Sequence, residues 1–493
     1  MSNLHEECGI FGIFSENRQN VAETVYYGLF ALQHRGQESC GIVVNDDGIF
    51  RDYKDNGLAH EVFTRHVLEN LGPGNMAIGH DRYSTTGANE RINAQPIVVN
   101  HHKGRMALAH NGNIVNAFEL RQELELQGSI FHTTNDSEVI AYVITKERIE
   151  SESIEEALNK AMGRIDGAYS LLIMSPQKMI ACRDPYGFRP LCYGKREDGT
   201  YIVASETCAL DAVGAEYIRD LEPGEILVFS KDGIRSIRDH CGEKEHKICI
   251  FEYLYFARPD SQIEGKSVHE ARRKAGAQLA MQYPVDADIV IGVPDSGLDA
   301  AIGYAEQSGI PYGMGFVKNK YIGRTFIAPG QKNREDKVRI KLNVIRNSVA
   351  GKRVVLVDDS VVRGTTITRI IQLVRSAGAT EVHVMSSAPA FTDACYYGVD
   401  VDTKENLIAC QCGYDQNKIA RKIGADSMGY LDVNTLHLII GNHPGEGFCS
   451  ACFGTGYPTP IPTGQKDRFE EKISTDIPEK ESEESYDKFL RVE

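Results

Sequence analysis

The sequence predicts two domains of different fold class, an α+β domain followed by an α/β domain with a parallel sheet. A chain of 493 residues exceeds what one hydrophobic core usually organises, so two domains are expected. The first half contains many short apolar runs separated by turn signals, which is typical of strands. Beyond about residue 265, predicted helices and strands alternate, as in βαβ units on a parallel sheet. The polar stretch 230–247 lies between the two patterns, so we place the boundary near residue 240.

Hydrophobic spacing predicts the elements of the first domain. Runs such as CGIFGIF, GIVVNDDGIF, AYSLLIM and EILVF predict strands. Three segments, roughly 21–33, 117–127 and 136–148, have apolar residues at every third or fourth position and predict amphipathic helices. Strands gathered around a few helices predict sheets that are layered against helices.

The second domain has a different order of elements. The runs ADIVIGVP, KRVVLVDD and TEVHVMSSAP predict strands, and the segments SVHEARRKAGAQLAMQ, LDAAIGYAEQSG and TTITRIIQLVRSAG between them predict helices. From about residue 463 the chain becomes charged and poor in aromatic residues, so we expect a loosely held tail there.

Composition favours a small-molecule substrate. The chain has 54 Lys and Arg residues against 69 Asp and Glu residues, and its formal charge of -15 repels nucleic acid and anionic membranes. No stretch approaches the roughly 20 apolar residues that span a bilayer, and the first residues lack the pattern of a signal peptide. We therefore expect a cytoplasmic protein, whose twelve cysteines are thiols, metal ligands or nucleophiles rather than disulfides.

Cys8 begins an apolar strand close to the N-terminus, and a lone cysteine in such a place is most often a buried core thiol. The segment GHDRYSTTG places Arg82 at a strand end, where its guanidinium could bind a carboxylate. The segment AHNGNI is expected to end a strand in a turn that offers the Asn111 amide and the Gly112 N–H to an oxyanion. The segment TTNDSEV puts Asp136 at a helix start, either as a cap or as an acceptor for an ammonium group. Each segment alone is weak evidence, because Asn-Gly is usually a turn and Asp at a helix start is usually a cap.

Together these segments resemble the class II glutamine amidotransferases, whose N-terminal-nucleophile domain is an αββα sandwich. The resemblance implies that residues 1–7 are a propeptide and that their removal makes Cys8 an N-terminal nucleophile. The freed α-amino group would be the general base, since its unperturbed pKa near 8 leaves a neutral fraction at neutral pH. By the same resemblance Asn111 and Gly112 stabilise the oxyanion, and glutamine is bound by Arg82, Thr85 and Asp136.

The run VVLVDDSVVRGTT in the second domain joins an apolar strand, two adjacent aspartates and a Ser/Gly/Thr loop that opens into a helix. In parallel sheets, ligands bind where strands end and helices begin, and backbone N–H groups there hold phosphate. Two carboxylates at a strand end could hold sugar hydroxyls or Mg²⁺, although a solvated acidic turn fits the residues equally well. The run FVKNKYIGRTFI fits either a nucleic-acid patch or a mobile cationic lid.

The same run resembles the phosphoribosyl diphosphate signature of the type I phosphoribosyltransferases. The resemblance implies that Asp358 and Asp359 face the ribose hydroxyls and bind Mg²⁺, with Ser296 of the GVPDSG turn as a further metal or diphosphate contact. The resemblance also favours a mobile lid over a nucleic-acid patch as the role of the run FVKNKYIGRTFI. The implied contacts of phosphoribosyl diphosphate are Asp358, Asp359, Ser360, Arg363, Gly364, Thr365 and Thr366, with Lys318, Lys320, Tyr321 and Arg324 in the lid.

Cys449 and Cys452 form a C-x₂-C pair, which could bind zinc, be redox-active or be structural. Cys249 and Cys395 lie in segments that resemble the cluster-bearing subclass of the glutamine phosphoribosyl diphosphate amidotransferases. That resemblance implies one [4Fe–4S] cluster held by these four thiolates, with a structural role and sensitivity to oxygen. The other candidates are expected to be core thiols, namely Cys40, Cys182, Cys192, Cys208, Cys241, Cys410 and Cys412.

The two halves together predict one reaction. Glutamine is hydrolysed at Cys8 through a thioester, and the ammonia attacks C1 of phosphoribosyl diphosphate, which yields 5-phosphoribosylamine, glutamate and diphosphate. This resembles the committed step of de novo purine synthesis, and the resemblance implies a homotetramer that purine nucleotides inhibit. An enclosed passage for ammonia is our hypothesis, since ammonia is mostly ammonium at pH 7. The expected parts are a propeptide (1–7), a glutaminase domain (8–240), a phosphoribosyltransferase domain (241–462) and an acidic tail (463–493).

Three alternatives share only part of this pattern. Glucosamine-6-phosphate synthase and asparagine synthetase have the first domain without the second, and the run VVLVDDSVVRGTT argues against both. A regulator that senses phosphoribosyl diphosphate and binds nucleic acid would not need a complete glutaminase domain or so negative a charge.

Overall fold

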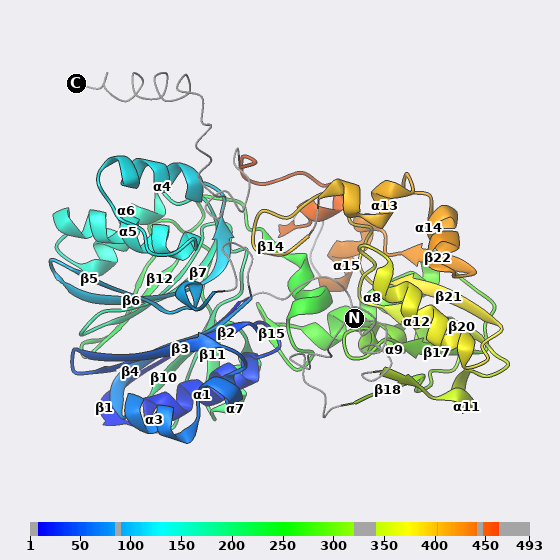
Figure 1. Ribbon diagram of the computed structural model, residues 1–493, viewed down its shortest axis with the longest axis horizontal. Coiled ribbons are helices and arrows are strands. Elements are labelled where there is room, and N and C mark those ends of the chain that lie inside the picture. The colour runs from blue at the N-terminus through cyan, green and yellow to red at the C-terminus, as the bar shows by residue number, and fades with distance from the viewer. Residues whose placement is uncertain (1–7, 84–89, 320–341, 402, 441–446, 463–493) are drawn as a thin grey trace, which may run out of the picture.

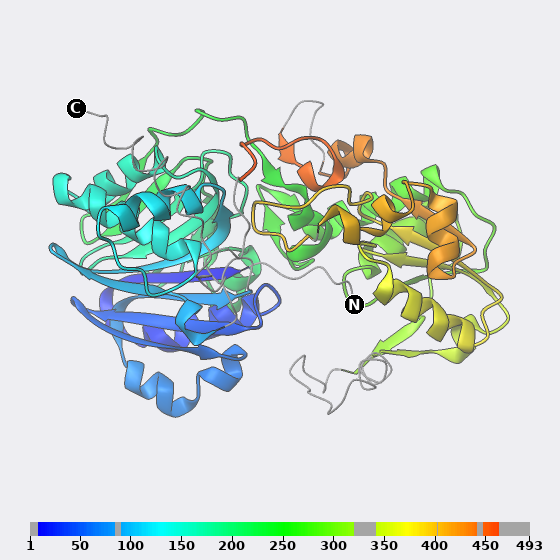
Figure 2. The same ribbon diagram turned by 45° about the horizontal axis from the view of Figure 1, so that its top comes forward.

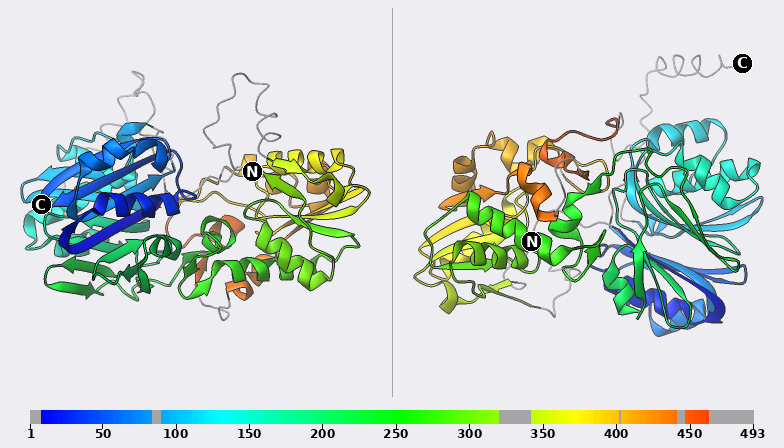
Figure 3. Two further views of the ribbon diagram at one scale, coloured as in Figure 1. Left: turned by 90° about the horizontal axis from the view of Figure 1, so that it is seen from below. Right: turned by 180° about the vertical axis from the view of Figure 1, so that it is seen from behind.

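The computed structural model of the chain consists of two bodies that lie side by side (Figure 1). It describes residues 8–83, 90–319, 342–401, 403–440 and 447–462. The first body holds two stacked antiparallel sheets, and the second holds a parallel sheet between helices. The views from below and from behind show the same two bodies with a junction between them (Figure 3). In the described part of the chain, no helix has both the length and the apolar character needed to cross a membrane.

The first body is a four-layer sandwich in which helices cover the outer face of each sheet (Figure 2). One sheet has the order β11-β9-β10-β1-β4-β2-β3 and the other has the order β13-β12-β8-β7-β6-β5. The strands are β1 (Gly9–Gln19), β2 (Ser39–Asp46), β3 (Ile49–Asn56), β4 (Gly74–Arg82), β5 (Ile97–His101), β6 (Gly104–Ile114), β7 (Gly167–Met174), β8 (Met179–Arg183), β9 (Cys192–Lys195), β10 (Tyr201–Ala204), β11 (Glu216–Asp220), β12 (Ile226–Ser230) and β13 (Gly233–Ile237).

The helices of this body fall into two sets. The first sheet is covered by α1 (Val21–Leu32), α2 (Ala59–Val62), α3 (Arg65–Leu71) and α7 (Thr207–Ala212). The second sheet is covered by α4 (Ala117–Leu126), α5 (Asp136–Glu150) and α6 (Ile154–Met162), and a 3₁₀ turn lies at Arg91–Asn93. The three long helices predicted from spacing begin where they were expected. The observed layers confirm the predicted fold class of the first domain.

Alternation along the strands decides which side chains meet in the middle of the sandwich. Along β1, Ile10 and Phe14 pack in the core between the two sheets, whereas Phe11 and Ile13 pack against α1 and its neighbours. Successive side chains of a strand point to opposite faces. The strand run CGIFGIF is therefore apolar throughout, because both faces of β1 are buried.

The second body is built on a parallel sheet with the order β17-β20-β21-β22. Its strands are β17 (Ile289–Gly292), β20 (Arg353–Asp358), β21 (Glu381–Ser386) and β22 (Ser427–Tyr430). One face is covered by α8 (Val268–Gln282), α9 (Leu298–Ser308) and α15 (Leu436–Ile440), and the other by α12 (Thr365–Ser376), α13 (Ile408–Gln411) and α14 (Gln416–Ile423). This confirms the α/β class predicted from the alternation of elements.

Smaller elements surround this sheet. They are β14 (Ile248–Cys249), β15 (Gln262–Ile263), β16 (Lys266–Ser267), β18 (Phe316–Lys318), β19 (Leu342–Val344), β23 (Phe448–Cys449), α11 (Arg346–Val349), a π-helical turn (Glu252–Phe256), and 3₁₀ turns at Lys404–Asn406, Val433–Thr435 and Ala451–Phe453. At the junction, β14 pairs in parallel with β23 near the end of the described chain. In Figure 2 the orange C-terminal segment lies beside the green junction segment, between the two bodies.

One local expectation is wrong. The segment 109–114 does not turn, because β6 continues to Ile114 and Asn111 pairs with Ser170 of β7. The polar stretch 230–247 contains β13, which pairs with β12 and extends the second sheet before the boundary placed near residue 240. In both places a neighbouring strand provides hydrogen bonds that the local turn signals do not reveal.

Candidate active sites

Cys8 lies next to the end of the strand that carries Arg82. The antiparallel pairing of β1 with β4 sets Gly9 opposite Asp81, so both strands end beside one another. Cys8 and Arg82 are both buried, and the Cys8 thiol lies 3.5 Å from the carbonyl oxygen of Tyr83. The predicted glutamine ligand Thr85 lies outside the described residues.

Asn111 and Gly112 lie within β6, on the sheet that stacks against the sheet of Cys8. The Asn111 amide is buried, and neither its nitrogen nor its oxygen has a hydrogen-bond partner among the described residues. Leaving such a group unpaired usually costs about 1–3 kcal/mol. Gly112 has a φ of 141°, and an added Cβ would lie 2.1 Å from the Ala168 oxygen, so only glycine fits there. This strand position therefore keeps a polar amide ready for a ligand.

Asp136 lies at the first position of α5, but it is not the cap of that helix. The side chain of Asn135 provides the cap by accepting a hydrogen bond from the Ser137 N–H at 2.9 Å. The Asp136 carboxylate instead accepts a hydrogen bond from the Ile114 N–H at 3.1 Å, which ties α5 to the end of β6. The other carboxylate oxygen accepts a hydrogen bond from the Ser137 hydroxyl at 3.4 Å and lies 3.6 Å from the His110 ring. Of the two roles open from the sequence, the structure thus excludes the cap.

Two buried histidines support the same strand end. The His110 ring lies 3.0 Å from the Ser137 hydroxyl and 3.3 Å from the Ala168 carbonyl oxygen, which fixes the strand just before Asn111. His80 contacts the His110 carbonyl oxygen at 3.0 Å, and burial lowers the pKa of His80 to about 3. His80 is therefore neutral at working pH and holds the two sheets together as an uncharged donor.

Asp81 is a buried carboxyl beside this site, but it faces away from it. Along β4, Ile78 packs between the two sheets and Ala77 packs against the helices. Because successive side chains alternate, Arg82 points between the sheets and Asp81 points toward the helices. Burial raises the pKa of Asp81 well above its usual range, and neither of its oxygens has a hydrogen-bond partner among the described residues. Asp81 therefore takes no part in the group around Cys8.

The acidic pair of the second domain lies where β20 ends. Asp358, Asp359 and Ser360 are all buried. The Asp359 carboxylate accepts hydrogen bonds from the Ser296 hydroxyl at 2.5 Å and from the Ser360 hydroxyl at 2.6 Å. Ser296 follows β17, the neighbouring strand, so the sheet edge brings both predicted segments together. Burial and the neighbouring Asp359 charge raise the pKa of Asp358 well above its usual range.

The loop after the acidic pair forms a hollow that leads into α12. Its lining consists of Asp358 and the run from Ser360 to Ile367, which includes Arg363, Gly364, Thr365 and Thr366. Gly364 has a φ of 80°, and a Cβ there would lie 2.4 Å from the Ile408 side chain, so glycine is required. The hollow opens at the N-terminus of a twelve-residue helix, where free N–H groups and the helix dipole favour an anion.

Only one residue of the predicted lid can be placed. Lys318 ends β18, which pairs with β19, and its ammonium group forms an ion pair with Asp295 of the loop after β17. Lys320, Tyr321 and Arg324 lie outside the described residues.

The four cysteines predicted as cluster ligands lie in one buried apolar group at the junction. Cys249 of β14 is paired in register with Cys449 of β23, and the Tyr397 N–H donates to the Cys395 thiol at 3.3 Å. Burial raises the pKa of Cys452, and charges on Cys395, Cys249 and Cys449 raise it further, so the four groups are close enough to interact. Within the described ranges, no set of three or more His, Cys, Asp or Glu side chains is arranged to hold a single metal ion.

Five of the seven remaining cysteines are buried as expected, namely Cys40, Cys182, Cys192, Cys208 and Cys412. The expectation is wrong for Cys241 and Cys410, which are partly exposed. Cys241 lies in the polar stretch after β13, and Cys410 lies in the short helix α13, so neither is fully covered by other elements.

Sequence reasoning missed a group of buried charged residues between the domains. Arg35 donates a hydrogen bond from Nε to the Cys8 carbonyl oxygen at 3.1 Å, and it also binds Glu206 and Glu252. These partners are 171 and 217 residues away in the chain. No local pattern marks Arg35 as special, so only the fold could reveal the contact.

Two family models match the chain. A glutamine amidotransferase domain matches residues 80–212, and a phosphoribosyl transferase domain matches residues 263–419. An amidophosphoribosyltransferase of Methanocaldococcus jannaschii is 48% identical over 468 residues, which cover 92% of this chain and 98% of the relative. An amidophosphoribosyltransferase of Bacillus subtilis is 47% identical over 465 residues, which cover 94% of this chain and 96% of the relative.

Two solved structures are similar over nearly their whole length. A glutamine phosphoribosylpyrophosphate amidotransferase from B. subtilis, in complex with ADP and GMP, has a TM-score of 0.85 at 47% identity and covers 92% of this chain and 98% of its own. A structure described as the allosteric regulatory enzyme of purine biosynthesis has a TM-score of 0.87 at 46% identity and covers 95% of this chain and 100% of its own.

Proposed function

The chain belongs to the amidophosphoribosyltransferase family, and from this premise we propose that Cys8 releases ammonia which the Asp358–Asp359 site consumes. The reaction is the first step of purine biosynthesis, in which glutamine, phosphoribosyl diphosphate and water give 5-phosphoribosylamine, glutamate and diphosphate. One observation carries the assignment of sites. The buried Asn111 amide of the first body has no hydrogen-bond partner among the described residues, and the parallel sheet of the second body ends in a buried acidic pair beside the hollow at the start of α12.

In the first half-reaction the Cys8 thiol attacks the side-chain amide carbon of glutamine. The thiol proton passes to the α-amino group of Cys8, which is free once residues 1–7 are removed, and then to the departing ammonia. Water cleaves the resulting thioester and releases glutamate. Arg82 and Asp136 hold the α-carboxylate and α-ammonium of glutamine, with Thr85 as a further contact.

The oxyanion of this half-reaction needs two donors, and β6 provides them. The Asn111 amide N–H₂ and the Gly112 backbone N–H donate to the oxygen that becomes negative as the carbon turns tetrahedral. The unpaired state of the Asn111 amide supports this role, because substrate would supply the partner that the protein does not. Loss of one such donor typically costs about 10²–10³ in rate.

In the second half-reaction, ammonia attacks C1 of phosphoribosyl diphosphate. The bond from C1 to diphosphate breaks, diphosphate leaves with the electron pair, and the new amine loses one proton. Asp358 and Asp359 orient the ribose hydroxyls, and the loop from Ser360 to Thr366 holds the 5-phosphate at the start of α12. The lid residues Lys318, Lys320, Tyr321 and Arg324 close over the diphosphate.

Mg²⁺ is the cofactor that these residues fit. It is usually held by one or two carboxylates together with substrate phosphates. The end of β20 offers oxygens of Asp358 and Asp359, and the loop after the neighbouring strand β17 offers the Ser296 hydroxyl. Two buried acids side by side favour a cation, since burial and mutual repulsion hold the pKa of Asp358 high. When bound, Mg²⁺ neutralises charge that develops on the leaving diphosphate.

Transfer of labelled nitrogen tests this function. With glutamine labelled at the amide with ¹⁵N, phosphoribosylamine should carry the label even when unlabelled ammonium is present in excess, because we propose an enclosed passage between the sites. Label that is diluted to the composition of the bulk ammonium would exclude the passage but not the chemistry. A product without label, formed from glutamine alone, would contradict the function.

The four junction cysteines support a [4Fe–4S] cluster as a second cofactor. Cys249, Cys395, Cys449 and Cys452 share one apolar group, and a backbone N–H already donates to the Cys395 sulfur. A four-iron cluster binds each thiolate through a different iron, so its ligands need not meet at one point as they do around a single ion. The cluster would tie β14 to β23 and would therefore stabilise the junction.

Protein purified without air tests the cluster and the propeptide together. We expect about four irons and four sulfides per chain and an intact mass that lacks residues 1–7. Exposure to air should remove the iron and lower the melting temperature of the wild-type protein. Cys449→Ser lacks one of the proposed ligands, so its melting temperature should be the same before and after exposure to air. Iron-free protein that is fully stable would exclude the cluster, and full glutamine-dependent activity in a chain that retains residues 1–7 would exclude the α-amine as the base.

Further properties are proposed from the family. Purine nucleotides are proposed as feedback inhibitors, which the ADP and GMP bound to the solved B. subtilis relative support. We also propose a cytoplasmic homotetramer, which light scattering of the purified protein would test. We keep the limits 8–240, 241–462 and 463–493 for the two domains and the tail, and the ends of the family matches at 212 and 419 are compatible with them.

A further inference from the structure

We propose that Arg35 is a positioning residue for the nucleophile and that Glu252, from the second domain, sets its position. The inference rests on the proposed role of Cys8. It assigns to the junction a direct mechanical connection between the phosphoribosyltransferase domain and the backbone of the residue that attacks glutamine.

Arg35 contacts the backbone of Cys8 itself. It follows α1 and is buried, and its Nε donates to the Cys8 carbonyl oxygen at 3.1 Å. The terminal nitrogens donate to Glu206 at 2.6 Å and to both oxygens of Glu252 at 2.9 and 2.7 Å. One planar guanidinium therefore joins the nucleophile to one carboxylate of its own domain and to one carboxylate of the other.

Glu252 continues the connection into the second domain. It begins the π-helical turn three residues after Cys249 and also accepts a hydrogen bond from Arg189 at 3.4 Å. The other donors of Arg189 bind the carbonyl oxygen of Tyr397 at 3.2 and 2.5 Å. Tyr397 lies two residues after Cys395. The chain of contacts thus runs from the nucleophile to the segments that carry two of the proposed cluster ligands.

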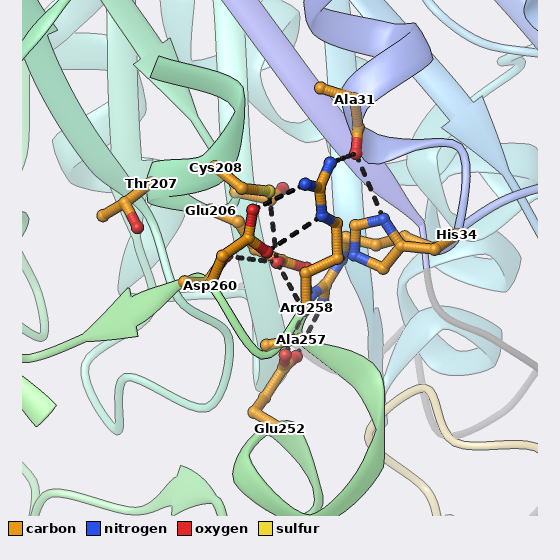
Figure 4. Close-up of polar contacts among 12 residues, drawn as sticks. Ala31, His34, Glu206, Thr207, Cys208, Glu252, Ala257, Arg258 and Asp260 are labelled. Carbon is orange, nitrogen blue, oxygen red and sulfur yellow. Dashed lines mark hydrogen bonds and ion pairs between the residues drawn. The ribbon is translucent and has the colours of Figure 1, made fainter. Parts of the chain in front are cut away.

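Glu206 anchors the guanidinium on the glutaminase side. Figure 4 shows Glu206 close to His34, Cys208 and Arg258, with Glu252 on the side of the π-helical turn. It contacts the His34 ring at 2.7 Å and accepts hydrogen bonds from the Ser261 hydroxyl at 2.7 Å and from the Arg258 N–H at 2.9 Å. Burial alone would raise the pKa of Glu206, but His34 and Arg35 hold it well below its usual range. Glu206 is therefore a fixed negative charge against which Arg35 is held.

The second domain contributes the Glu252 carboxylate to the buried charges of this group. Arg35 and Arg189 are two buried cations, and Glu206 and Glu252 are two buried anions. If the turn that carries Glu252 is displaced, the buried Arg35 charge loses one of its carboxylate partners. We therefore expect the guanidinium to follow Glu252 and to shift the Cys8 carbonyl group to which it is bound. Displacements of about 1 Å near a reacting group can change rates by about 10².

A second ion pair joins the two domains but does not contact Cys8, and it provides a matched control. Arg183 is as buried as Arg35, and it donates to Glu264 of the second domain at 2.8 Å. Its other donors bind the carbonyl oxygens of Arg189, Gly187 and Leu221. A substitution at Arg183 therefore weakens the junction but leaves the hydrogen bond to Cys8 in place.

Arg35→Lys tests the inference, because lysine keeps the charge but cannot bind Cys8, Glu206 and Glu252 at once. The glutamine-dependent rate should fall by about 10- to 100-fold, with a larger effect on kcat than on KM. The ammonia-dependent rate should change less than about twofold, and alkylation of Cys8 by an electrophilic glutamine analogue should slow in parallel. Arg183→Lys should leave the ratio of the two rates unchanged.

Glu252→Gln tests the contact between the two domains, because it removes the negative charge that the second domain contributes to Arg35. We expect the glutamine-dependent rate to fall by about tenfold while the ammonia-dependent rate persists, which also shows that the variant is folded. Equal effects of Arg35→Lys and Arg183→Lys on the ratio, or no effect of Glu252→Gln on it, would overturn the inference. If Cys8→Ser kept its glutamine-dependent activity, the assignment of the nucleophile would fail instead.

Discussion

Cys8→Ser is expected to lose glutamine-dependent synthesis of phosphoribosylamine by at least about 10³-fold, while synthesis from ammonium persists. A serine hydroxyl keeps the shape of the thiol but gives up its proton far less readily, so the α-amine alone cannot activate it. The second site does not use Cys8, and ammonium in the medium replaces the missing internal supply. The two rates are measured side by side, with glutamine or with ammonium chloride as the nitrogen source.

Cys241→Ser is the matched control for this variant. Cys241 is a partly exposed thiol at the boundary between the two domains, and its backbone N–H donates to the Arg238 carbonyl oxygen at 3.0 Å. Its substitution should leave both rates within about twofold, as is usual for surface changes. Parallel loss of both rates in Cys8→Ser would mean that the fold was damaged, and retention of both would mean that another residue is the nucleophile.

Asp358→Asn is expected to lower synthesis from either nitrogen source by about 10²–10³-fold, while the glutaminase half-reaction continues. The substitution keeps the size of the side chain but removes a charge that the proposed site uses for the ribose hydroxyls and Mg²⁺. It also removes the carboxyl group whose pKa burial and the neighbouring Asp359 charge raise. The expected result is thus a specific loss of the second half-reaction, together with a higher Mg²⁺ requirement.

Release of glutamate and formation of diphosphate, measured on the same sample, distinguish the two half-reactions. Asp426→Asn is the control, because Asp426 is an exposed acid just before β22. Its side chain binds Arg375 at 2.7 Å and the Val382 N–H at 2.6 Å, where β21 and β22 begin and thus away from the hollow. It should keep both half-reactions. Normal synthesis in Asp358→Asn would show that the acidic pair does not bind phosphoribosyl diphosphate.

The fold class could be predicted from local pattern because each helix and strand is encoded over a short stretch of chain, whereas the residues of the two sites stay predictions that rest on a resemblance. The period of apolar residues marked α1, α4 and α5, and the alternation of elements after residue 265 marked the parallel sheet. The acidic run and its Gly364 loop were visible because strand, carboxylates and helix start are contiguous. Nothing beyond neighbouring residues was needed to expect an anion at that helix.

The errors lie where strands pair with distant partners. The segment that ends at Ile114 looked like a turn because it contains Asn-Gly, but β7 offers it hydrogen bonds through to Gly167. The pairing of β13 with β12 was likewise not visible in the polar sequence of that segment. Local preference is weak in strands, and the partner strand decides.

By itself the sequence determined the fold class of the two domains and suggested candidate residues for each site, but only the tertiary structure placed the buried charges at the junction between the domains. Arg35 is an ordinary polar residue after a helix until folding places Glu206 and Glu252 around it, from 171 and 217 residues away. The physical reason is that a buried charge is stable only with opposite charges in contact, and those partners need no fixed spacing in the chain.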